Sequence, residues 1–172
     1  MANEYSVSLK MRGEIVEVLD ASLAIASVSR DSRTLKHLVD VDKTLNAGTV
    51  PTVTKVAVFS HTLVDEDPDV DDVIDLTALT HAVAQAVDAT ALKVVGIVIQ
   101  ADSENAAAVV VEAGASNGYT LLGAAFKVAI AAGATLMYDG AGPAISGTVK
   151  TLDVSGTPGD VIAFMILFGV QA

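Results

Sequence analysis

Cysteine and tryptophan are both absent from this chain of 172 residues, and aromatic side chains make up only 4% of it. Without cysteine the chain can form no disulfide, no thiolate nucleophile and no cysteine-ligated zinc site. Carbohydrate-binding modules usually stack a sugar on exposed aromatic rings, and the only tyrosines here are Tyr5, Tyr119 and Tyr138. The scarcity of aromatic residues therefore argues against a glycan-binding module.

Positive charge is also scarce, with 10 Lys and Arg against 21 Asp and Glu and a formal net charge of −11. Proteins that bind a nucleic-acid backbone draw much of their affinity from clustered Lys and Arg. We therefore expect no nucleic-acid partner.

Long apolar segments of the kind that cross membranes are missing as well. The strongly apolar residues 161–170 reach only half of the roughly 20 residues that a spanning helix needs, so we interpret them as a terminal core strand. The first five residues do not pair a basic segment with an apolar core, which predicts no signal peptide. We expect a protein that is made in a cytoplasm and has no membrane partner.

Small aliphatic residues are what the chain has in excess. Hydrophobic residues make up 52% of the sequence although aromatic ones are few, so most of them are Val, Ala, Ile and Leu. Soluble monomers rarely leave large apolar patches exposed, and small aliphatic side chains suit contacts between sheets and between subunits. We therefore expect a homo-oligomer.

The most regular stretch is residues 93–100, which are β-branched from Val94 to Ile99 except for Gly96. A short apolar run of this kind predicts a central strand that is buried on both faces. Residues 106–111 follow after the polar residues 102–105, and this spacing predicts that they pair with the first run as a hairpin.

Other strands are predicted from the alternation of apolar and polar residues and from turns rich in Gly, Pro, Asn and Asp. Residues 35–41 fit a strand or a short helical turn, and residues 79–87 fit a helical turn or a loop. The further strands are expected at residues 5–11, 15–19, 22–30, 53–64, 72–76, 126–130, 135–138, 147–154 and 161–170. Residues 15–19 fit either a separate strand or a continuation of the first, and residues 22–30 leave a helix open.

This pattern predicts an all-β fold, an antiparallel β-sandwich or jelly roll with few short helical turns. The length fits one domain over residues 1–172. Within it, we expect residues 1–12 to form a strand or an arm that engages a neighbouring subunit.

The acidic run at residues 65–72 is the one charged feature that suggests chemistry. Clustered carboxylates bind Ca²⁺ in many proteins, and the candidate ligands here are Asp65, Asp67, Asp69, Asp71 and Asp72. The run does not match an EF-hand, because it lacks the glycine at the sixth position and the glutamate at the twelfth. We favour a solvated loop that limits edge-to-edge association over a calcium site.

No catalytic motif is present. His37, His61 and His81 are far apart and form no pair spaced for one helical face, and there is no Gly-x-Ser-x-Gly sequence for a serine nucleophile. Residues 140–143 lack the later glycine and the helix that a phosphate-binding loop needs, so they predict a turn. We predict no catalytic residue, no cofactor site and no enzymatic activity.

The last hundred or so residues contain a characteristic order of strands and turns. It is carried by Asp75-Leu76-Thr77, residues 94–102, Asn117-Gly118-Tyr119, Ala132-Gly133 and residues 150–156. This order resembles that of small β-sandwich accessory proteins of tailed-phage virions, such as capsid decoration or cement proteins and head-fibre bases.

The resemblance implies a non-enzymatic virion protein that acts through oligomeric and lattice contacts. The partners that it implies are copies of the chain itself, with a trimer favoured, and a major capsid or other virion protein. The alternative is a calcium-dependent binding module that uses the acidic run.

Overall fold

The computed structural model describes residues 6–18, 34–46, 52–64 and 72–170. Every regular element within these ranges is a β-strand, and no helix occurs in them. The predicted all-β fold with antiparallel sheets is therefore confirmed. By internal contacts the chain divides into two compact units, Val7–Thr44 and a larger one made of Met1–Ser6 with Leu45–Ala172. The single domain expected over residues 1–172 stays a prediction.

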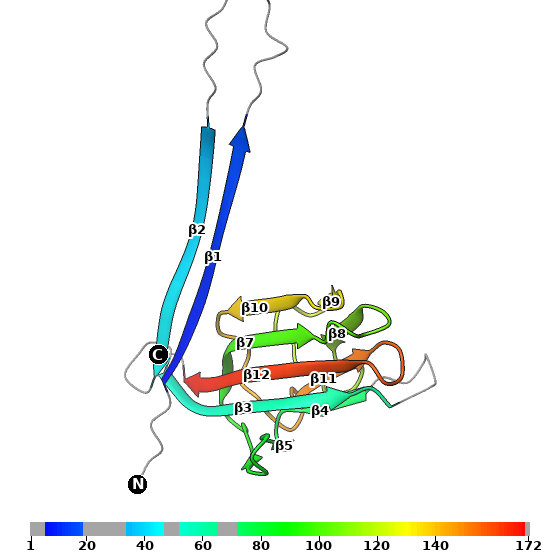
Figure 1. The fold of residues 1–172 in the computed structure, drawn as a ribbon. Helices are drawn as coiled ribbons and strands as arrows, with labels where there is room; N and C mark the ends of the chain where they lie inside the picture. The colour runs from blue at the N-terminus through cyan, green and yellow to red at the C-terminus, as the bar shows by residue number, and fades with distance from the viewer. Residues whose placement is uncertain (1–5, 19–33, 47–51, 65–71, 171–172) are drawn as a thin grey trace, which may run out of the picture. The chain divides into compact units, whose positions relative to one another are not determined.

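The smaller unit is a sheet of two long strands, β1 (Ser6–Val18) and β2 (Thr34–Asn46). Each has 13 residues, and the two run in opposite directions (Figure 1). Residues 15–18 continue the first strand past Gly13, and residues 35–41 are strand and not a helical turn. The strand predicted at residues 22–30 lies outside the described ranges.

The larger unit contains two antiparallel sheets of four strands each. One sheet, called the β12 sheet here, has the order β10-β7-β12-β3, and the other, the β11 sheet, has the order β4-β11-β8-β9 (Figure 1). The strands are β3 (Thr52–Thr62), β4 (Asp72–Asp75), β7 (Lys93–Ala101), β8 (Val109–Ala113), β9 (Lys127–Ile130), β10 (Thr135–Asp139), β11 (Thr151–Ser155) and β12 (Val161–Val170). All pairs within the two sheets are antiparallel.

Side chains from both sheets form one hydrophobic core. Phe164 and Ile166 of β12 belong to the same buried cluster as Val111 of β8 and Val154 of β11. The ring of Phe164 stacks on that of Phe59, with 5.1 Å between the ring centroids. Because each fully buried large aliphatic or aromatic side chain contributes about 1.5–3 kcal/mol, this core dominates the stability of the unit.

The central position of β7 is confirmed, because it pairs with β10 on one side and β12 on the other. Its predicted hairpin with residues 106–111 is wrong, since β8 pairs with β11 and β9 in the other sheet. The Asn105 side chain bonds both backbone groups of Val161, and the Asp160 carboxylate accepts from the N–H of Ala106 at 2.8 Å. These bonds hold the segment between β7 and β8 against the start of β12. The chain therefore passes to the other sheet and does not form a hairpin with β7.

Residues 79–87 form neither a helical turn nor an irregular loop. They contain two short paired strands, β5 (Leu79–Thr80) and β6 (Ala86–Val87). The turn between them is closed by the N–H of His81, which donates to the carbonyl of Gln85 at 2.8 Å, and Ala84 takes a positive φ of 60°. The prediction at this segment was therefore wrong.

Candidate interaction face

The outer face of the β12 sheet presents rows of side chains that run across all four strands. The rows alternate with those that point into the core, as the antiparallel register requires. The first outer row contains Thr135, Gln100, Ala163 and Ser60. The second contains Met137, Val98, Met165 and Val58. The third contains Asp139, Gly96, Leu167 and Val56.

The second row is apolar and partly open. Val58 is 38% exposed, and the other three side chains of the row are half-buried. In the third row, by contrast, Leu167 and Val56 are buried. The prediction that both faces of β7 are covered is therefore wrong at its C-terminal half, where Val98 is half-buried and Gln100 is exposed.

Charge is nearly absent from this face. Asp139 is the one ionisable side chain among the twelve positions of the three rows, although the whole chain carries a net charge of −11. Copies of a strongly acidic protein repel one another, and the repulsion is weakest where neutral surfaces meet. We call the first two rows the outer apolar face, although only the second row is wholly apolar and the first is uncharged but mostly polar. This is the candidate interaction face.

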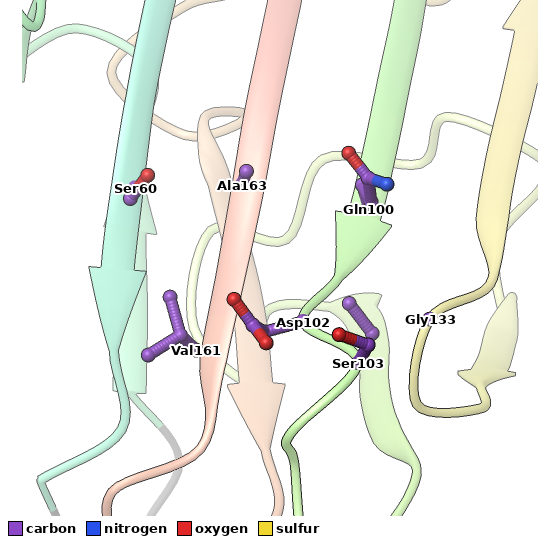
Figure 2. A pocket seen from close by; sticks show the side chains of 8 residues that line it. Ser60, Gln100, Asp102, Ser103, Gly133, Val161 and Ala163 are labelled. Carbon is purple, nitrogen blue, oxygen red and sulfur yellow. The ribbon is translucent and has the colours of Figure 1, made fainter.

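A shallow pocket lies at one end of this face, where β7 ends and β12 begins. Its lining includes Ser60, Gln100 and Ala163 of the first row, together with Asp102 and Ser103 (Figure 2). The volume is about 260 Å³, below the roughly 300–1,000 Å³ typical of small-molecule sites. Asp102 accepts a hydrogen bond from the N–H of Glu104 at 2.9 Å, so its carboxylate is already part of a turn.

The predicted cation site is only partly within the described residues. Asp72 begins β4, and its Oδ2 atom accepts from the N–H of Val64 at 3.1 Å and lies 3.4 Å from Nε2 of His61. No hydrogen-bond partner is found for that His61 nitrogen, so the pair is in contact without a well-aligned bond. Asp65, Asp67, Asp69 and Asp71 lie outside the described ranges.

The two other histidines, His37 and His81, lie in different segments of the chain from His61. No group of three His, Cys, Asp or Glu side chains that could hold a metal ion occurs among the described residues. His81 accepts from the N–H of Val83 at 3.2 Å, and His37 lies within β2. The calcium hypothesis and the absence of catalytic residues stay predictions.

The ion pair between Lys150 and Asp75 ties β11 to β4 from outside the core. Asp75 also accepts two hydrogen bonds from Thr77, at 2.8 Å from its N–H and 2.6 Å from its hydroxyl. Desolvation raises the pKa of Asp75, but the bonds from Lys150 and Thr77 outweigh it and bring the pKa below 3.8. The carboxylate is thus held ionised as a structural group.

No family model, curated protein or solved structure matches this chain. Among the described residues, no helix is long and apolar enough to cross a membrane.

Proposed function

We propose that this chain is a non-enzymatic structural protein of a virion, a capsid decoration or cement protein or another head-associated component. It acts through contacts with copies of itself and with a major capsid or other virion protein. The observation that carries the proposal is the order of the strands in the two four-stranded sheets.

Numbered from one to eight along the chain, strands β3, β4 and β7 to β12 lie in the orders 6-3-8-1 and 2-7-4-5. A ribbon of eight strands that folds over as two Greek keys would give this order, so the order supports the jelly roll that the sequence predicts. Jelly rolls occur in viral capsid proteins, in lectins and in cupins. The strand order thus supports a shell protein as one of three common uses of the fold.

Side-chain placement favours the shell protein over a lectin. Lectins usually stack a sugar on exposed aromatic rings. Of the tyrosines among the described residues, Tyr119 is fully buried and Tyr138 packs against the core, and the sequence has no tryptophan. The outer apolar face offers instead an uncharged surface, in which a row of valine and methionine side chains lies beside a row of small or polar ones. Such a surface suits packing against another protein.

A second copy of the chain is the occupant that we propose for the outer apolar face. Its neutrality in a chain of net charge −11 makes it the place where two copies meet with little repulsion. The net charge of −11 keeps a many-copy shell component soluble before assembly, and contacts of this kind give it packed interfaces afterwards.

A mass-spectrometric inventory of particles tests the proposal. Virions from the producing culture are purified on a density gradient, and their proteins are identified before and after a high-salt wash that removes adsorbed material. The proposal expects this chain in the washed particle fraction. Its presence only in the soluble fraction of the lysate would overturn the proposed role.

A further inference from the structure

The β1–β2 ribbon is a sheet of only two strands within a compact unit of its own. Its 13-residue strands extend for about 43 Å at roughly 3.3 Å per residue. An isolated two-stranded hairpin is marginally stable in water and needs further strands or a packing surface. Each strand keeps one edge that no other described strand pairs with, so the ribbon is a template for strand addition.

The charge balance of the ribbon differs from that of the rest of the chain. The unit Val7–Thr44 contains six basic and six acidic residues, so its formal charge is zero. The basic ones are Lys10, Arg12, Arg30, Arg33, Lys36 and Lys43, and the acidic ones are Glu14, Glu17, Asp20, Asp31, Asp40 and Asp42. The remaining four basic and fifteen acidic residues give the larger unit the whole charge of −11. Besides the outer apolar face, the ribbon is therefore a second part of the chain whose own charge does not oppose the approach of another copy.

The charges along β1 are also arranged in two halves. Lys10 and Arg12 precede Gly13, while Glu14 and Glu17 follow it. When two β1 strands run antiparallel and pair with Gly13 opposite Gly13, the basic half of one lies along the acidic half of the other. Arg12 of each strand is then directly opposite Glu14 of the other, while Lys10 and Glu17 each face an apolar residue. Opposite charges in cross-strand positions stabilise a sheet, and like charges directly opposite destabilise it.

The charges of β2 do not have this property. Its order along the chain is Lys36, Asp40, Asp42 and Lys43, so two antiparallel copies centred on Asp40 would place the acidic residues near each other. The edge of β1 is therefore the better edge for self-pairing.

We propose that β1 of one copy pairs antiparallel with β1 of a second copy about a two-fold axis near Gly13, which joins two ribbons into one four-stranded sheet. A two-fold contact of this kind is isologous, because each strand presents the same edge to the other. This inference rests on the proposed structural role and adds to it the partner of β1, which is a second copy of the chain. A trimer formed by the larger units is compatible with it, since the ribbons then link copies in neighbouring trimers.

Charge-reversal variants of the full chain test the pairing. The double variant K10E/R12E makes β1 wholly acidic, and E14K/E17K makes it wholly basic. Each alone is expected to weaken self-association by about tenfold or more in sedimentation velocity, because like charges then face each other along the strand. An equimolar mixture of the two variants is expected to restore association. The matched control is K36E/K43E in β2, which is expected to leave association within about twofold.

A cysteine probe reports the register independently. The chain has no cysteine, so Gly13→Cys introduces the only thiol. Residues directly opposite in antiparallel strands have Cα atoms about 4.5–5.5 Å apart, which a disulfide can bridge. Under mild oxidation we expect Gly13→Cys to form a covalent dimer on non-reducing gels, and Val39→Cys at the middle of β2 to remain monomeric.

These experiments separate failure of the inference from failure of the proposed function. The β1 pairing is wrong if both β1 double variants leave self-association unchanged, or if the two cysteine variants cross-link equally. Neither result bears on the virion role, which the inventory of purified particles tests separately. A wild-type chain that stays monomeric at all accessible concentrations also overturns the pairing.

Discussion

The backbone N–H of Val94 donates a hydrogen bond to the hydroxyl of Tyr119 at 3.0 Å inside the core of the larger unit. The same hydroxyl donates to the carbonyl of Pro143 at 2.9 Å, so one buried side chain joins β7, the loop before Tyr119 and the loop after β10. No sequence motif predicts this arrangement, although Tyr119 is the last residue of the Asn-Gly-Tyr segment that forms part of the virion resemblance.

Replacing Tyr119 by Phe is expected to destabilise the protein, because it leaves the Val94 N–H and the Pro143 carbonyl without their partner. The buried Val94 N–H then costs about 1–3 kcal/mol, and the Pro143 carbonyl, which is only partly buried, costs less. Denaturant unfolding followed by circular dichroism measures the loss. The control is Tyr138→Phe, since the Tyr138 hydroxyl makes no hydrogen bond to the described residues. Equal losses in the two variants would contradict the role given to Tyr119.

Tyr119 also makes stability fall at high pH. Burial raises its pKa to about 12 from 10.0, so the unfolded chain loses this proton at a lower pH than the folded one. Below pH 10 the contribution is fully present, and it is lost as pH rises from 10 to 12, by about 2 kcal/mol. Unfolding free energies at pH 9 and pH 12 are expected to differ less in Tyr119→Phe than in the wild type. The same pH dependence in both proteins would contradict this.

Gly142 is required by the position of Tyr119. A Cβ atom at Gly142 would overlap the Tyr119 hydroxyl, whereas a Cβ at Gly147 meets nothing within 4 Å. Gly142→Ala is therefore expected to cost about 1–3 kcal/mol, as overpacking in a core does. Thermal melts compare it with Gly147→Ala, which is expected to leave the melting temperature nearly unchanged. A larger loss in the Gly147 variant would contradict the packing.

The ion pair of Asp75 with Lys150 predicts an acid-dependent loss of stability. Because the pKa of Asp75 is lowered in the folded state, its contribution is present above pH 3.8 and lost as pH falls through the lowered pKa. Asp75→Asn is expected to be less stable than the wild type at pH 7, by up to about 1 kcal/mol, since the pair is partly exposed. The difference is expected to vanish near pH 2 in urea unfolding.

Asp88→Asn is the control for that experiment. Asp88 accepts the same two bonds from the N–H and hydroxyl of Thr90, but the nearby Lys55 ammonium donates to the backbone carbonyl of Asp88 and not to its carboxylate. A loss at pH 7 as large as that of Asp75→Asn would show that the Asp-x-Thr turn, and not the ion pair, sets the effect.

The outer apolar face predicts a change in oligomeric state for Val58→Lys. This variant lowers the net negative charge and so weakens overall repulsion, yet it places a charge in the apolar row. Self-association measured by light scattering after size exclusion is expected to fall by about tenfold, a cost near 1.4 kcal/mol. Val73→Lys is the matched control, because Val73 is 57% exposed on the β11 sheet. Equal behaviour of the two variants would rule out the face as an interface.

Much of the fold could be predicted from the sequence because the longer strands have a clear period of two and end at turn residues. Residues 53–64 and 161–170 are examples, and they form β3 and β12. The strands that pair with β8 could not be predicted from the sequence. Their choice depends on hydrogen bonds that hold the segment between β7 and β8 against the start of β12, and these join Asn105 and Ala106 to residues about 55 positions later. The strands β5 and β6 are too short to show any period.

The candidate face was harder to predict than the strands. A run of β-branched residues such as 93–100 has the same pattern whether one or both faces are covered. Only the register with β12 and β10 shows that Val98 lies in an apolar row that remains partly open. The acidic run gave a clear signal in the sequence, but of its candidate ligands only Asp72 lies among the described residues.

The number of copies of this chain in each purified virion tests the central claim most directly. Absolute quantification against isotope-labelled peptides gives its ratio to the major shell protein in salt-washed particles. A structural component that covers or cements a shell is expected at a fixed ratio that is comparable to that protein and is the same between preparations. A trace amount that varies between preparations, or complete loss in the wash, would contradict the account.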